Sequence, residues 1–166
     1  SAILHLNHYA RSGADADYEK FKQAISVPLS LSAARKELDR GGNNKQLIRE
    51  SLLKGGNHPF DVHVLSHVMP LVWNLDHFAH SRNLWHIADY YIELINSVGF
   101  NINYWYKNGN NINNSLINNW KDEISYIHEI IFLLEKDFID ELGNSSRKLA
   151  FALTLLNIFT AILLSS

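Results

Sequence analysis

The sequence contains no cysteine, and this absence limits the chemistry open to the protein. Without thiols the chain can form neither disulfide bonds nor thiolate metal sites, and it carries out no thiol redox chemistry. The absence fits a compartment in which an unpaired thiol would be a liability.

An excess of positive charge is also missing. Lysine and arginine together number 15 against 17 acidic residues, which gives a formal net charge of -2. No basic stripe is present, so the chain has no general attraction to phosphate backbones or anionic lipids. The charge balance therefore argues against a nucleic-acid-binding module, and we predict no nucleic-acid partner.

Catalytic signatures are lacking too. The chain has no G-x-S-x-G, H-E-x-x-H or G-x-x-x-x-G-K-[ST] motif, and Gly41 to Lys45 is only a polar loop. Four acidic residues lie along one amphipathic segment, where a solvated face explains them better than an acid-base pair: Glu135, Asp137, Asp140 and Glu141. We therefore predict that this chain is not an enzyme, and we predict no cofactor.

The sequence contains enough apolar and aromatic residues to form a hydrophobic core. It has 166 residues, 46% of them hydrophobic, with four Trp, seven Tyr and eight Phe, which suits one domain. Helix-start and helix-end signals recur, whereas alternating strand patterns with hairpin turns do not. The prediction is an all-α fold.

Helix-start and helix-end residues divide the N-terminal half into several helices. A short helix over Ile3 to Arg11 ends at Gly13, and Asp15 or Asp17 caps a second helix that Pro28 bends or ends. A third helix, Lys45 to Lys54, has Asn44 as its cap and Gly55-Gly56 at its end. Pro59 then occupies the first position of a helix that Pro70 should kink.

Two long helices are predicted in the second half. One runs from Phe78 to Val98 with Gly99 as its left-handed cap, and Asn101 to Asn119 is expected to be a long ordered loop. The other carries apolar residues at spacings of four and three, typical of a left-handed bundle: Trp120, Ile124, Ile127, Ile131, Leu134, Phe138 and Leu142. We predict a four-helix-bundle-like domain with short additional helices.

The C-terminal run from Leu149 to Leu164 has no charge and is apolar on all faces, directly after Arg147-Lys148. It is typical of a truncated membrane span, since a complete span needs about 20 such residues. A buried core helix is the alternative, because Thr154, Asn157 and Thr160 soften the hydrophobicity.

Several segments between Tyr9 and Asp89 form a recognisable set: Tyr9-Ala10-Arg11-Ser12-Gly13-Ala14-Asp15-Ala16-Asp17-Tyr18-Glu19-Lys20-Phe21, Val27-Pro28-Leu29 with Ala34-Arg35, Gly55-Gly56-Asn57-His58-Pro59 with Asp61-Val62, and Trp85. Together these segments resemble the extracytoplasmic input domain of proteobacterial membrane receptors, which precedes GGDEF/EAL modules or histidine kinases.

The resemblance implies a periplasmic sensor over residues 3–148, held in the inner membrane by flanking helices, with residues 149–166 beginning the second transmembrane helix. Such a domain would work as a homodimer and transmit a small-molecule or protein stimulus by helix movement to a cyclic-di-GMP or kinase module. The rival hypothesis is a soluble helical binding protein for a metal, haem or small molecule.

Candidate ligand-binding residues are His58, Asp61 and Trp85. His58 belongs at a helix N-terminus near Asp61, where it either caps the turn or helps to bind an anion. The four tryptophans could line a small-molecule cavity, although core packing is their usual role: Trp73, Trp85, Trp105 and Trp120.

Nine histidines raise the question of a metal or haem site. His63 and His67 are four residues apart, and His77 and His80 are three apart, so each pair shares a helix face. Zinc requires three or four converging ligands, however, and the spacing does not show that these residues and His86 meet. We predict no metal site.

Overall fold

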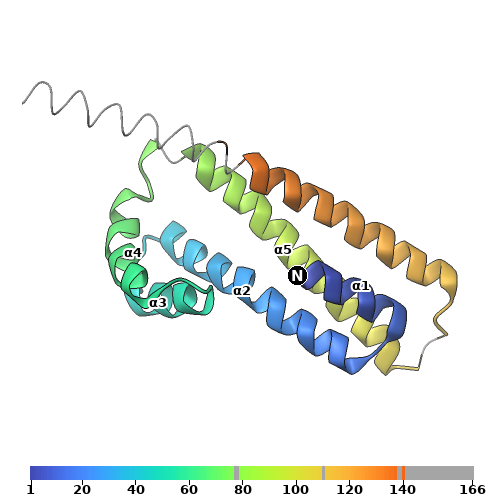
Figure 1. The fold of residues 1–166 in the computed structure, drawn as a ribbon. Helices are drawn as coiled ribbons and strands as arrows, with labels where there is room; N and C mark the ends of the chain where they lie inside the picture. Colours follow the sequence, from blue (N-terminus) through green and yellow to red (C-terminus); the bar gives the residue numbers. More distant parts are fainter. Residues whose placement is uncertain (77–78, 110, 138–139, 141–166) are drawn as a thin grey trace, which may run out of the picture.

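The computed structural model describes residues 1–76, 79–109, 111–137 and 140, and within these ranges all regular structure is helical (Figure 1). This confirms the predicted all-α fold. The helices are α1 (Ala2–Ser12), α2 (Asp15–Asp39), α3 (Lys45–Lys54), α4 (Pro59–Val72), α5 (Ala79–Lys107) and a further helix over residues 114–137.

The end of α1 depends on a glycine, as predicted. Gly13 adopts a left-handed conformation with φ 63°, and its N–H donates to the Tyr9 carbonyl over 2.8 Å. A Cβ at this position would lie 2.4 Å from the Tyr106 ring, so space as well as backbone conformation requires glycine.

The start of α2 differs from the prediction. Ala14 is the capping residue, and Asp15 and Asp17 lie within the first turn, where their charges favour the helix dipole. Asp17 instead accepts a hydrogen bond from the Ser12 hydroxyl over 3.2 Å. Pro28 does not end the helix, because α2 continues to Asp39.

Both boundaries of α3 and the start of α4 are confirmed. The Asn44 side chain accepts from the Leu47 N–H over 3.0 Å, and the His58 Nδ1 accepts from the Phe60 N–H over 3.3 Å. Pro59 follows as the first residue of α4, where a missing N–H costs no helical hydrogen bond.

The predicted helix end at Gly99 is wrong. Gly99 is buried in the middle of α5, and a Cβ there would lie 2.3 Å from the ring of Phe21 on α2. The glycine therefore allows two helices to approach closely and does not terminate one. The role of a helix glycine depends on what faces it, which its local sequence does not specify.

The predicted loop over Asn101 to Asn119 is too long, because only residues 108–109 and 111–113 of the described chain are not helical. The first part continues α5 to Lys107, and Ile102 within it is fully buried. Asn113 then caps the next helix, accepting from the Leu116 N–H over 2.9 Å. Burial of the apolar face outweighs the weak preference of asparagine for loops.

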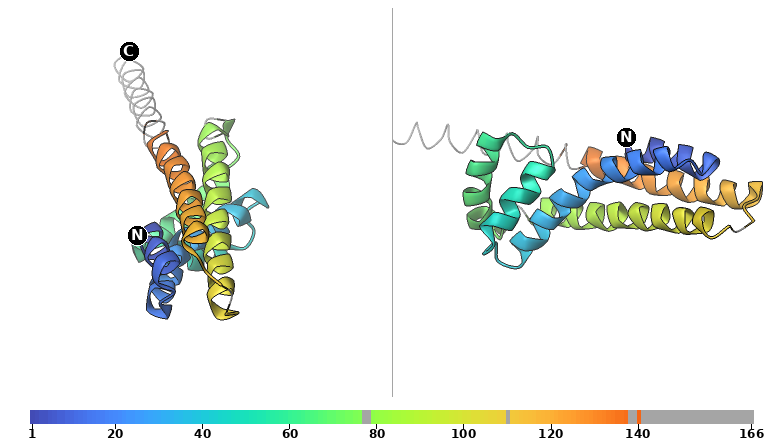
Figure 2. Two further views of the ribbon diagram at one scale, coloured as in Figure 1. Left: turned by 90° about the vertical axis from the view of Figure 1, so that its right-hand side faces the viewer. Right: turned by 90° about the horizontal axis from the view of Figure 1, so that it is seen from below.

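Four helices share the first hydrophobic core: α1, the first half of α2, α5 and residues 114–137. They lie alongside one another, with α1 antiparallel to α2 and α5 antiparallel to the helix over 114–137 (Figures 1 and 2). The buried members of this core are Leu6, Tyr9, Ala10, Phe21, Ile25, Ile95, Val98, Ile102, Trp120, Ile124 and Ile127. The predicted stripe on the last helix is thus buried at its start, while Phe138 and Leu142 lie outside the described residues.

A second core lies at one end of the long helices. There α3 packs against the C-terminal half of α2, and α4 packs against α3 (Figure 2). Its buried residues are Ala34, Leu38, Ile48, Leu52, Val62 and Trp73, with Leu31, Leu65, Met69 and Trp85 packed against them. The predicted short additional helices therefore build a separate apolar unit.

The predicted membrane segment, residues 149–166, lies outside the described residues. Among the residues that the structure does describe, no helix combines the length and the apolar character needed to cross a membrane.

Candidate functional site

A pocket of about 270 Å³ lies within the second core, where four helices meet. Most of its wall is aliphatic, and the turn between α3 and α4 closes one side. The lining residues are Leu31, Ala34, Arg35 and Leu38 of α2, Leu52 of α3, Gly55, Gly56 and Asn57 of the turn, Leu65 and Met69 of α4, and Trp85 of α5. We name this the α2–α5 pocket, after the four helices α2, α3, α4 and α5 that line it.

Two stacked indoles connect the end of α4 to α5 beside this pocket. The rings of Trp73 and Trp85 lie 5.3 Å apart and 8° from parallel. The Trp73 Nε1–H donates to Asp39 Oδ1 over 2.8 Å, and Arg82 donates to the Trp73 carbonyl. These bonds hold the buried Trp73, which in turn fixes the plane of the Trp85 ring that faces the pocket.

A buried ion pair joins α2 to α5 at the edge of the pocket. The guanidinium of Arg35 donates from Nε and Nη2 to the two carboxylate oxygens of Asp89, and its side chain is 14% exposed against 8% for Asp89. The same guanidinium stands 5.8 Å from the centre of the Trp85 ring. Charge pairing and ring contact together fix the orientation of Arg35.

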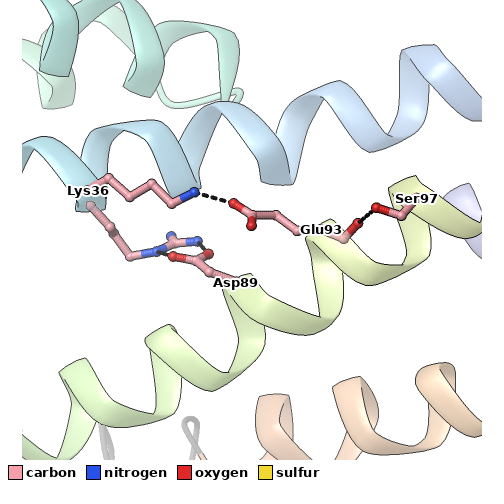
Figure 3. A network of polar contacts seen from close by, with 5 residues as sticks. Lys36, Asp89, Glu93 and Ser97 are labelled. Atoms are coloured by element: carbon pink, nitrogen blue, oxygen red, sulfur yellow. Dashed lines mark hydrogen bonds and ion pairs between the residues drawn. The ribbon is translucent and has the colours of Figure 1, made fainter. Parts of the chain in front are cut away.

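A second, more exposed ion pair lies one residue further along α2. Lys36 donates to Glu93 of α5, and about half of each side chain is exposed (Figure 3). The Glu93 carbonyl accepts from the Ser97 hydroxyl over 3.0 Å. Lys36 does not line the pocket, so this pair ties the two helices together without contributing to the binding surface.

The structure separates the three predicted site residues. Trp85 lines the pocket, whereas His58 and Asp61 are exposed at the start of α4 and do not. His58 acts as the helix cap, the structural role weighed for it from the sequence. Its neighbour Asn57 lines the pocket, and the Asn57 amide group donates to the Leu52 carbonyl over 2.9 Å.

The histidines do not converge within the described part of the chain. The rings of His63 and His67 lie 5.0 Å apart, but His67 Nδ1 is 2.8 Å from the His63 carbonyl, as expected for a contact along one helix. His86 lies 3.7 Å from Asp39, and His77 is outside the described residues. No group of three or more candidate metal ligands is present among the residues described.

The other tryptophans and the buried tyrosines belong to the first core. Trp105 and Trp120 meet edge to face with centroids 6.5 Å apart. Burial, followed by the nearby negative charge of Asp15, raises the pKa of Tyr9 to about 12, and the Tyr9 hydroxyl donates to Asn103 over 2.8 Å. Burial also raises the pKa of Tyr106.

A larger hollow of about 470 Å³ lies over α3 and α4 and is lined by Lys45, Gln46, Arg49, Glu50, Leu53 and His67. All of these side chains are exposed and come from only two helices. The α2–α5 pocket is the better candidate, despite its smaller volume, because buried and partly buried groups from four helices line it.

Sequence reasoning missed the pairing of Arg35 with Asp89, although a signal was present. Arg35 comes four residues after Leu31 and three before Leu38, and Asp89 comes four after Trp85. Both charges therefore lie on helix faces that are otherwise apolar. A lone charge on an apolar stripe indicates a buried partner, because an unpaired charge there is too costly.

The chemistry of the α2–α5 pocket suits binding. Its wall is apolar with one guanidinium and one amide, and none of the described lining residues is an acid, a hydroxyl or an imidazole.

Comparisons with protein-family profiles, curated proteins and solved structures found no match to this chain.

Proposed function

We propose that this chain is the periplasmic sensor domain of a bacterial transmembrane receptor, and that the α2–α5 pocket receives its stimulus. The resemblance in sequence to receptor input domains motivates the class of protein. The observation that carries the proposal is the convergence of three resembling segments, Ala34-Arg35, Gly55-Gly56-Asn57 and Trp85, on one pocket. Segments 20 and more positions apart along the chain thus share one place in the fold.

The position of the pocket suggests how a stimulus would be transmitted. Arg35 and Lys36 connect α2 to Asp89 and Glu93 of α5 beside it, so any ligand that moves Arg35 also changes the fit between these helices. From Ala79 to Lys107, α5 is one helix, which at 1.5 Å per residue is roughly 43 Å long. A displacement at the pocket would therefore reach the other end of the domain.

The proposal includes the receptor context. The four helices of the first core would act as a receptor-type four-helix bundle that pairs with a second copy, and residues 149–166 would begin the second transmembrane helix. The output module would be a GGDEF, EAL or kinase domain at the cytoplasmic face of the inner membrane. The chain itself would have no catalytic activity.

A chimaeric receptor tests the proposal. The chain is placed after a transmembrane helix and ahead of a diguanylate cyclase module in bacterial cells, and cyclic-di-GMP is measured. Leu65→Trp, which fills the pocket, should change the output by several-fold. Val64→Trp is the matched control, because Val64 is the adjacent residue of α4, is 46% exposed and does not line the pocket.

Equal output from both variants and the unmodified chain would refute the sensor proposal. Topology provides an independent measurement: alkaline phosphatase fused after residue 140 is active only if that point lies in the periplasm. An inactive fusion together with retained ligand binding would instead favour a soluble helical binding protein.

A further inference from the structure

The α2–α5 pocket carries one charge, and it is positive. Arg35 is the only ionisable side chain among the lining residues described, while its partner Asp89 does not line the pocket. A ligand with a negative group would therefore meet the cationic member of this ion pair, with no lining carboxylate to repel it. Because Arg35 is 14% exposed, solvent screens this attraction far less than it would at the surface.

The guanidinium retains hydrogen-bonding capacity. Asp89 uses the edge formed by Nε and Nη2, and Nη1 makes no hydrogen bond to any described residue. An arginine has five N–H donors, so its second edge, Nη1 and Nη2, is left for another acceptor pair. Carboxylates match that fork with two parallel hydrogen bonds.

The rest of the wall is apolar. Leu31, Leu38, Leu52, Leu65 and Met69 provide aliphatic contacts, and Trp85 provides an aromatic face. At about 270 Å³ the pocket is just below the roughly 300 Å³ at which drug-sized ligands begin to fit. A compact molecule with an apolar body would fill it, whereas a sugar or an inorganic ion would leave these groups poorly matched.

We propose that the α2–α5 pocket binds a small organic acid, with its carboxylate on the second edge of Arg35 and its apolar body against Trp85 and the leucines. The ligand carboxylate would share the charge of the guanidinium with Asp89 and so weaken the tie between α2 and α5. As a signal, this binding rests on the proposed sensor function. As a binding event, it is independent of that function.

Isothermal titration of the 166-residue chain with four probes tests the ligand class. The probes are 3-phenylpropionate, the uncharged 3-phenylpropanamide, propionate and inorganic phosphate. We expect 3-phenylpropionate to bind at least tenfold more tightly than the amide, because charge-assisted bonds to Arg35 are lost in the amide. Propionate and phosphate should bind more weakly still, since they lack the apolar body.

Variants identify the residue responsible. Arg35→Gln should weaken 3-phenylpropionate binding at least tenfold, whereas Lys36→Gln, which removes the neighbouring tie to α5, should leave it within twofold. Asp89→Asn should tighten it several-fold, because the guanidinium would no longer be neutralised. Circular dichroism verifies that the variants fold. If Arg35→Gln does not fold, two titrations still test the proposal: the comparison of the four probes on the unmodified chain, and 3-phenylpropionate with Leu65→Trp, which fills the pocket.

Equal binding of 3-phenylpropionate and its amide, or phosphate binding as tightly as 3-phenylpropionate, would overturn the proposal. So would binding that Lys36→Gln and Arg35→Gln weaken alike. The chimaeric receptor separates this failure from failure of the sensor function. If Leu65→Trp changes the output of the receptor while the chain binds none of the organic acids, the domain is a sensor for another ligand.

Discussion

Replacing Gly99 by alanine tests how closely α2 and α5 approach. By helix propensity alone, alanine in the middle of α5 would stabilise the protein by about 1 kcal/mol. The added Cβ, however, would lie 2.3 Å from Cε1 and 2.7 Å from Cζ of Phe21, whose side chain is 1% exposed. Carbon atoms prefer about 3.5 Å, so ring and helix must separate by roughly 1 Å.

Overfilling a packed core in this way costs about 1–3 kcal/mol. Subtracting the gain in propensity, we expect Gly99→Ala to destabilise the protein by up to about 2 kcal/mol. For a chain of this size the upper limit corresponds to a fall in Tm of roughly 4–8 °C. Urea unfolding followed by circular dichroism measures the change, and Ser97→Ala is the control, because Ser97 is exposed on the same helix.

A double-mutant cycle identifies the contact itself. Phe21→Leu removes the ring edge that the new methyl group meets, so Gly99→Ala in that background should be neutral or stabilising. If Gly99→Ala raises the stability of the unmodified protein, or if its cost is unchanged by Phe21→Leu, then Gly99 and Phe21 are not in contact.

Three further predictions concern charge and metal. Asp89→Ala should lower the free energy of unfolding by about 3–5 kcal/mol, because it leaves Arg35 buried and unpaired. Glu93→Ala should lower it by at most about 1 kcal/mol, because the pair that Glu93 forms with Lys36 is half exposed. Equal losses for the two variants in urea titrations would contradict this difference. The pKa of Tyr9 is raised from 10.0 to about 12, so burial of its neutral form stabilises the fold below pH 10, and this contribution is lost as the pH rises to 12. Tyr9→Phe should therefore lose less stability than the unmodified protein between pH 10 and pH 12. An equal loss in the two proteins would argue against the pKa shift. Zinc and EDTA should leave the Tm unchanged, and a rise with zinc that EDTA reverses would revive the metal-binding hypothesis.

Local sequence signals were sufficient to predict the class of fold and most helix boundaries in the N-terminal half. Gly13, Asn44 and His58-Pro59 mark helix ends through contacts with residues two to four positions away, and such local chemistry can be predicted from sequence. The apolar spacing of Trp120, Ile124 and Ile127 also predicted the face that is buried.

Other features depend on how the helices pack against one another. Gly99 resembles a helix cap in sequence, and only the ring of Phe21 shows why glycine is needed there. Arg35 and Asp89 are 54 positions apart, and the pocket beside them exists because α3 and α4 fold back over α2. Spacing along the chain defines the face on which a charge lies, but its partner and the cavity between them depend on how separate helices pack.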